Sequence, residues 1–199
     1  IGILLAYGIR LNGGAVFVVI TRFASLGYAI PGAVLAIGIF IPMGLLDNGI
    51  DEFMRERFNT STGLLLSGTI AALTFAYVVR FLALSLGAVE ASLGRITNNI
   101  DGVARTLGAS PGATLFRVHL PIVRAGLLTG AILVFVDVMK ELPMTVIMRP
   151  FNFETLATFV YQYASDELLN ECAPAALTIV LAGLLPVLLL NRAIDNKKK

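Results

Sequence analysis

Long runs of apolar residues divide the chain, and most charged residues lie between these runs. The segments 23–46, 59–79 and 172–191 contain no charged residue, and the segment 121–139 contains only Arg124 and Asp137. A helix of about 20 apolar residues crosses the hydrocarbon core of a bilayer. We therefore expect four complete membrane spans, at about 23–46, 61–82, 121–139 and 173–190.

The apolar stretch 1–9 is too short to cross a bilayer, so it predicts the truncated end of a fifth span. The chain opens without methionine and without the basic leader of a signal peptide. We expect residues 1–199 to form one transmembrane domain that is a C-terminal fragment, or one half, of a longer polypeptide.

Three local signals set the expected ends and packing of the spans. The polar run at 59–62 supplies candidate N-caps for the helix that follows it. Arg80 interrupts the apolar run of that helix, and we interpret it as the cytoplasmic boundary of the span. Gly126 and Gly130 form a GxxxG motif, which predicts close packing against a neighbouring helix.

The composition is that of a membrane protein. Hydrophobic residues make up 57% of the chain and charged residues 14%, with a mean hydropathy of +0.84, whereas soluble domains are about 25% charged. The single cysteine, Cys172, excludes an internal disulfide, and no CxxC or HExxH spacing points to a metal site. We expect an all-α, polytopic transmembrane helical bundle without a metal site, and we interpret the single histidine, His119, as structural.

The basic residues indicate how the spans are oriented. With the C-terminal tail in the cytoplasm, 11 of the 15 Lys and Arg residues lie inside and four outside, which is the bias expected of cytoplasmic loops. Topology thus explains the net charge of +2, and no nucleic-acid partner is expected. The inner set is Arg10, Arg22, Arg80, Arg95, Arg105, Arg117, Arg124, Arg192, Lys197, Lys198 and Lys199; the outer set is Arg55, Arg57, Lys140 and Arg149.

The cytoplasmic segment at about 88–121 has the pattern of a helix-turn-helix. Gly108 is typical of a helix C-terminus, and Ser110 followed by Pro111 is typical of a helix start. The segment carries more apolar side chains, among them Leu107 and Phe116, than a loop that only connects two spans needs. We therefore expect this segment to fill a groove on a partner.

This segment resembles the coupling loop of bacterial ABC importer permeases, whose pattern is Glu-Ala-Ala, three residues, Gly, nine residues, and then Ile-x-Leu-Pro. The acidic position of that pattern falls on Gly102, and Asp101 stands one place earlier. Val103 replaces the first alanine and Val118 the isoleucine, while Ala104, Gly108, Leu120 and Pro121 match in register.

The resemblance implies a pore in the bacterial inner membrane that accepts cargo from a periplasmic binding protein and is driven by cytoplasmic ATPase subunits. The chain has no GxxxxGK[ST] phosphate loop. We therefore expect a transport subunit that is not an enzyme and binds no cofactor, with ATP on the partner subunit. The implied coupling residues are Gly102, Val103, Ala104, Leu107, Gly108, Pro111, Phe116, Val118, Leu120 and Pro121.

The segments 26–32, 138–143 and 149–157 resemble the second half of ferric-iron importer permeases, in which one chain carries two homologous permease halves. This resemblance implies a second permease half as a partner and ferric iron as the cargo. Thiamine, sulfate and polyamines are alternatives within the same class.

Asp137, Lys140 and Glu141 stand at the outer end of the span 121–139, and their spacing places them on one helix face. They are interpreted either as an acidic station on the translocation path or as an interfacial ion pair. A secondary transporter or channel that uses these three residues is the alternative from another class, although it has no need of a cytoplasmic helix-turn-helix.

A second polar group, Arg149, Asn152 and Glu154, flanks an aromatic pair in the outer segment. We interpret it either as a contact for the binding protein or as a polar turn between interfacial helices.

Overall fold

The computed structural model describes residues 1–195, and all regular elements within that range are helical. The predicted all-α class is therefore confirmed. Lys197, Lys198 and Lys199 of the predicted cytoplasmic tail lie outside the described residues. The elements are α1 (Gly2–Asn12), α2 (Ala15–Ala24), the 3-10 turn η1 (Ser25–Tyr28), α3 (Gly32–Phe58), α4 (Ile70–Leu93), α5 (Asn98–Thr106), α6 (Pro111–Thr114), the π turn η2 (Leu115–His119), α7 (Leu120–Met139), α8 (Pro143–Met148), α9 (Leu156–Ser165) and α10 (Leu169–Asp195).

Four helical segments among the described residues are long and apolar enough to cross a membrane. They are α3, α4, the continuous helix Pro111–Met139 and the part Leu169–Leu188 of α10. The number equals that of the predicted complete spans. Helix α7 and the part Leu169–Leu188 of α10 lie close to the predicted 121–139 and 173–190, whereas α3 and α4 are shifted along the chain.

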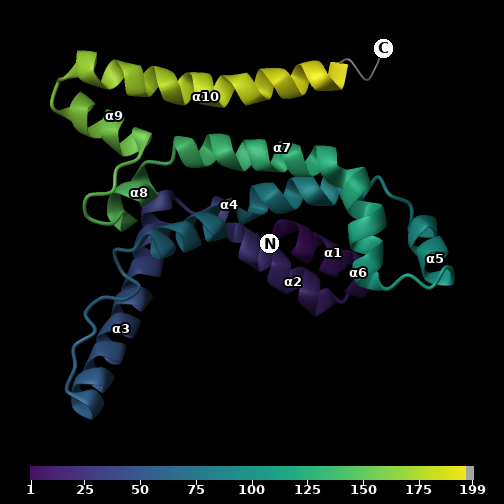
Figure 1. Cartoon of the computed structure of the whole chain (residues 1–199), viewed down its shortest axis with the longest axis horizontal. Helices are drawn as coiled ribbons and strands as arrows, with labels where there is room; N and C mark the ends of the chain where they lie inside the picture. Colours follow the sequence, from purple (N-terminus) through teal and green to yellow (C-terminus); the bar gives the residue numbers. More distant parts are fainter. Residues whose placement is uncertain (196–199) are drawn as a thin grey trace.

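Helix α4 is the centre of the bundle. Its C-terminal half packs with α1 and α7 through a core cluster that includes Leu86, Val89 and Val123. Its N-terminal half packs with α3 and α8 through a second cluster that includes Ala76 and Met144. In Figure 1, α10 runs beside α7, which in turn lies along α4, and α9 folds back onto α10.

The GxxxG motif lies where α7 crosses α4. A Cβ atom added at Gly126 would lie 1.6 Å from Ser92 Oγ, and one added at Gly130 would lie 3.0 Å from Ala88 Cβ. Only residues without a Cβ allow the helices to approach this closely. The predicted packing role of the motif is therefore confirmed.

The first complete span is broken, which the sequence prediction of 23–46 missed. Residues 23–28 belong to α2 and η1, the chain is non-helical at 29–31, and α3 begins at Gly32. Two constraints favour the break. Pro31, at φ −54° and ψ 135°, caps α3 in an extended conformation, and a Cβ at Gly27 would lie 2.4 Å from the Val79 carbonyl oxygen.

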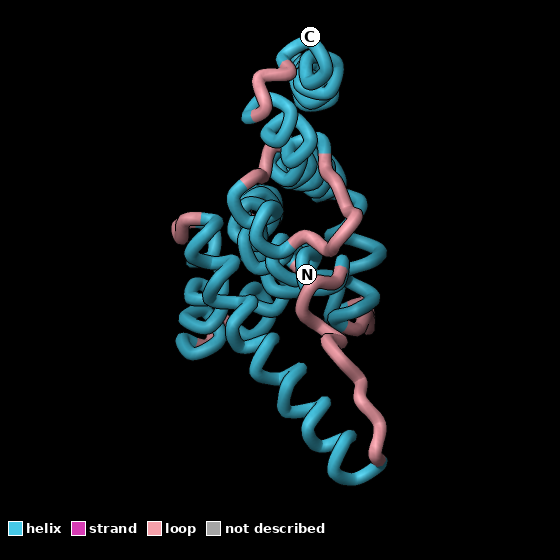
Figure 2. The backbone as a smooth tube through the Cα atoms, turned by 90° about the vertical axis from the view of Figure 1, so that its left-hand side faces the viewer, coloured by secondary structure: helices cyan, strands magenta, loops and turns pink. Residues whose placement is uncertain are grey.

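Helix α3 also continues past the predicted end at Leu46, because its acidic residues bind the returning chain instead of ending the helix. Asp47 is fully buried and accepts the backbone N–H groups of residues 65–67 at 2.7–3.1 Å. Asp51, one turn later, accepts those of Thr62 and Gly63. The segment 59–69 therefore runs back along the C-terminal half of α3 (Figures 1 and 2).

The start of α4 differs from the predicted one for the same reason. Residues 59–62 belong to the returning segment, and the N-cap is Thr69, whose Oγ1 accepts the Ala72 N–H at 3.1 Å. Helix α4 then runs to Leu93, well beyond the predicted end at 82. Arg80 is the eleventh of the 24 residues of this helix, so the helix continues for 13 residues beyond the predicted cytoplasmic boundary.

Candidate functional site

The segment 98–119 is a helix-turn-helix, as predicted. Helix α5 ends at Thr106, and Gly108 adopts φ +77°, a left-handed conformation that favours glycine. Ser110 Oγ then accepts the Ala113 N–H at 3.2 Å and caps α6, with Pro111 in its first turn. Local sequence signals alone account for this geometry.

The second arm of this motif continues into a helix that is long and apolar enough to cross a membrane. Helix α6, η2 and α7 form one helix from Pro111 to Met139. The π turn at Leu115–His119 ends two residues before Pro121. Because proline has no N–H and its ring crowds the carbonyl four residues earlier, a local widening of the helix here has an identifiable cause. No loop separates α6 from α7.

The outer face of the motif carries apolar side chains with no partner within the described residues. Val103 is 59% exposed, Leu107 81% and Phe116 66%. We call these three residues the coupling face. Of the other predicted coupling residues, Gly102, Gly108, Pro111 and Pro121 are exposed, Val118 and Leu120 are half-buried, and Ala104 is buried.

The acidic residue beside the family position turns inward. Asp101 pairs with Arg10 of α1 at 2.8 Å, and its other oxygen lies 2.8 Å from Nε2 of the fully buried His119. This contact does not meet hydrogen-bond geometry, so we describe it as close packing of the two side chains. The sequence gave no signal that Arg10 belongs with this segment, because 91 residues separate it from Asp101.

A second group of charged residues lies at the break between η1 and α3. Arg80 donates from Nε to Glu141 Oε2 at 3.1 Å and from Nη1 to the carbonyl of Ile30 at 2.8 Å. Glu141 Oε1 accepts the Met144 N–H at the start of α8 at 3.1 Å. The ion pair therefore joins the broken span, α4 and α8, and satisfies a carbonyl that the break leaves without a helical partner.

This ion pair lies deep in the bundle. At 1.5 Å per residue, Arg80 is about 15 Å from the N-terminus of α4 and about 20 Å from its C-terminus. The first residue of α3 packs directly on the pair, since a Cβ at Gly32 would lie 2.7 Å from Glu141 Oε1. The N-termini of α3 and α8 both approach this carboxylate, and helix N-termini stabilise negative charge.

Asp137, Lys140 and Glu141 do not lie on one helix face, as the sequence predicted, but divide between two ion pairs. Asp137 pairs with Lys140 at 2.8 Å and accepts the Tyr28 hydroxyl at 3.1 Å, on a half-exposed side of the bundle. Glu141 points to Arg80 instead, because α7 ends at Met139 and the chain turns into α8. All four carboxylate oxygens of Asp137 and Glu141 thus already have donors or cations inside this chain.

The charge arrangement favours the ion-pair interpretation over the acidic station. Two carboxylates face two cationic side chains, so the cluster has no net negative charge to attract a cation. No group of three or more His, Cys, Asp or Glu side chains within residues 1–195 is placed to hold a metal ion. Arg80 was available as a signal, since an arginine within an apolar run often has a buried partner.

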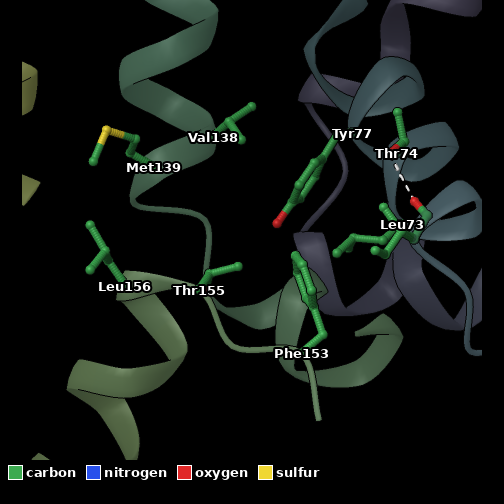
Figure 3. A pocket seen from close by; sticks show the side chains of 9 residues that line it. Leu73, Thr74, Tyr77, Val138, Met139, Phe153, Thr155 and Leu156 are labelled. Carbon is green, nitrogen blue, oxygen red and sulfur yellow. Dashed lines mark hydrogen bonds between the residues drawn. The ribbon is translucent and has the colours of Figure 1, made fainter. Parts of the chain in front are cut away.

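Beside this cluster, a cavity of about 300 Å³ opens between the N-terminal half of α4, the end of α7 and the segment 153–156. Figure 3 shows Tyr77 of α4 above Phe153 on one side of it, with Met139 and Leu156 across from them. The Tyr77 hydroxyl is hydrogen-bonded to Thr145 of α8. The lining is mostly apolar and suits a hydrocarbon group better than a hydrated ion.

Arg149, Asn152 and Glu154, which were predicted to lie on the outer side, belong to a polar turn that an ion pair closes. Arg149 donates to Glu154 and, at 3.0 Å, to the Phe153 carbonyl, while Asn152 at the tip has φ +60°. The hydrogen bond from Arg149 lowers the pKa of the Glu154 carboxyl below its usual value. Phe151 at the same tip is 99% exposed, so the turn presents an aromatic ring outward, which fits either interpretation of this group.

Comparison with known proteins gives a family match over the whole of this chain. Residues 1–199 match the family described as "Binding-protein-dependent transport system inner membrane component". The Fe(3+)-transport system permease protein FbpB 2 of Haemophilus influenzae is 28% identical over 173 residues, which are 87% of this chain and 31% of that protein.

Two further relatives differ in the solute that their names give. The putative 2-aminoethylphosphonate transport system permease protein PhnV of Salmonella paratyphi A is 31% identical over 128 residues, 64% of this chain and 48% of that protein. The trehalose transport system permease protein SugB of Mycobacterium tuberculosis is 26% identical over 195 residues, 94% of this chain and 70% of that protein. The chain thus spans about a third of the first relative and about half of the second.

Proposed function

The chain belongs to the family of binding-protein-dependent transport system inner membrane components, and from this premise we propose that it is a transmembrane subunit of an ATP-driven importer. The family is one of transport permeases, and the helices describe a multi-pass membrane protein. In our proposal the chain forms half of a translocation path in the bacterial inner membrane, and a second permease half completes the path.

The observation that carries the proposal is the exposed coupling face on the helix-turn-helix 98–119. Val103, Leu107 and Phe116 present apolar area at the end of the bundle where α1, α4 and α7 converge. Apolar side chains of this size are worth about 1.5–3 kcal/mol each when buried, so a groove on an ATPase subunit would bind them. The continuous helix Pro111–Met139 supplies the route by which movement of that subunit reaches the membrane.

We propose ferric iron as the cargo. Support comes from the Fe(3+)-transport permease, which is similar over 87% of the chain. The paired state of Asp137 and Glu141 argues that these carboxylates position helices and that iron selection rests with a periplasmic binding protein, for which the turn 149–154 with the exposed Phe151 is the proposed contact. Phosphonate and trehalose are the solutes named for other relatives, and they remain the cargoes to compare.

The coupling face is tested by co-purification of the full-length protein with its ATPase subunits. Leu107→Asp places a charge on the most exposed residue of the face, and we expect loss of the associated ATPase. Arg105→Gln is the matched control, because Arg105 is exposed on the same helix but outside the face. Equal ATPase recovery from wild type and Leu107→Asp would contradict the proposal.

A further inference from the structure

We call the helix-turn-helix 98–119 the coupling segment. Four side chains hold it against helix α1, and we call them the clasp: Tyr7, Arg10, Asp101 and His119. Tyr7 and Arg10 come from α1, Asp101 from α5 and His119 from η2. The chain connects α5 and η2 to α4 and α7 directly. The contact with α1 is made only through space, between residues about 90 to 110 positions apart.

Arg10 is the centre of the clasp. Its side chain is 14% exposed and donates to Asp101 Oδ2 at 2.9 Å, to the Leu93 carbonyl at 2.7 Å and to the Ile96 carbonyl at 2.8 Å. The last two carbonyls lie at and just beyond the C-terminus of α4, where helix carbonyls lack helical partners and cationic groups are favoured. One guanidinium therefore binds α1 to the end of α4 and to α5.

The second half of the clasp binds α1 to the other arm of the helix-turn-helix. The Tyr7 hydroxyl donates to the Pro111 carbonyl at 2.8 Å, and its ring meets the His119 ring edge to face, with centroids 5.3 Å apart. His119 is fully buried, Tyr7 is 5% exposed and the Asp101 side chain is 15% exposed. Groups shielded to this degree hold their geometry more firmly than exposed pairs do.

We propose that the clasp makes α1 and the coupling segment one mechanical unit, so that movement at the coupling face reaches α1 as well as α7. In this arrangement Asp101 is a positioning residue that faces inward and does not contact the ATPase. This inference rests on the proposed function for its transport readout, and on the structure alone for the fastening of α1 to α5.

The test uses the full-length protein in liposomes with its ATPase subunits, its binding protein and ferric iron, and compares wild type with Arg10→Gln and Asp101→Asn. We expect both variants to retain ATPase association, because the coupling face is unchanged. The number of ATP molecules hydrolysed per iron imported should rise by about fivefold or more, the lower end of typical coupling between distant sites.

Two matched controls separate the clasp from a general effect of charge. Glu90→Gln removes a partner of Arg22 in an exposed pair between α2 and α4, and Arg124→Gln removes an exposed charge from α7. Neither should change the ratio of hydrolysis to import. Tyr7→Phe, which removes one hydrogen bond, should give a smaller change in the same direction and guards against variants that fail to fold.

Hydrogen exchange on the purified protein tests the fastening without the ATPase. Arg10→Gln and Asp101→Asn should speed exchange in α1 and in 98–119 together, while α10 is unchanged. Loss of ATPase association in Asp101→Asn would make Asp101 a contact residue and overturn the proposal, as would unchanged exchange in α1. The two proposals can fail separately. If the wild type binds no ATPase but both variants speed hydrogen exchange in α1 and 98–119, the proposed function is contradicted and the fastening of α1 by the clasp is supported.

Discussion

Removing one charge of the Arg80–Glu141 ion pair should destabilise the bundle, because the remaining charge would be buried without its partner. The Arg80 side chain is 17% exposed and that of Glu141 is 8% exposed. Loss of one partner from a buried pair costs about 3–5 kcal/mol, whereas replacement of both by apolar residues is often close to neutral. We expect Arg80→Met and Glu141→Leu each to lower the free energy of unfolding by about 3–5 kcal/mol.

The double variant should lose much less than the sum of the single losses. Denaturant unfolding of the purified protein in detergent, followed by circular dichroism, gives the three differences of a double-mutant cycle, and we expect a coupling of at least about 2 kcal/mol. Glu141→Gln keeps a carbonyl acceptor and should lose about 1.5–3 kcal/mol, the range for a hydrogen bond to a charged group.

The half-exposed pair of Asp137 and Lys140 is the internal control. The Lys140 side chain is 63% exposed, so Lys140→Met should change stability by less than about 1 kcal/mol. Additive single losses at Arg80 and Glu141, within about 0.5 kcal/mol, would refute the reasoning, because residues that do not interact behave in this way.

Three further predictions concern two glycines and one ion pair. Gly108→Asp should abolish ATPase association while the protein still inserts into the membrane, because φ +77° strains a residue with a side chain and the turn would shift the coupling face; normal co-purification would contradict this. Gly126→Val should lower the free energy of unfolding by about 1–3 kcal/mol or more through a clash with Ser92, and an unchanged unfolding midpoint would argue against the α4–α7 contact. The Arg149–Glu154 pair should stabilise the turn 149–154 fully above the ordinary glutamate pKa of 4.5 and lose its effect as the pH falls through the lowered pKa of Glu154; hydrogen exchange of the turn in wild type, but not in Glu154→Gln, should show this dependence.

Local signals in the sequence predicted the helix-turn-helix because each of its features needs only neighbouring residues. Gly108 ends one helix and Ser110 caps the next through groups within a few positions. The GxxxG motif likewise predicted a packing face on α7, but the sequence did not show that α4 is the helix that packs against it. The helical class followed from the length of the apolar runs alone.

The prediction missed the end of α3 because it took the first acidic residue after the apolar run as the end of the span. It did not foresee that the segment 59–69 runs back along α3 and binds these acidic side chains. Asp47 and Asp51 lie one turn apart within α3 and bind the backbone of residues 62–67. Their charges therefore do not end the helix. The pairs Arg80–Glu141 and Arg10–Asp101 join residues 61 and 91 positions apart. Such contacts depend on tertiary packing, so even where a residue such as Arg80 stands out in an apolar run, the sequence does not show which partner it meets.

The most direct test of the proposed transport role is iron accumulation in liposomes that contain the full-length protein, its ATPase subunits and its binding protein. We expect ferric iron to accumulate only when ATP is present on the ATPase side, and accumulation to disappear in Leu107→Asp. Accumulation without ATP that follows an imposed proton or sodium gradient, and that persists in Leu107→Asp, would show a secondary transporter and contradict the coupling of this chain to an ATPase.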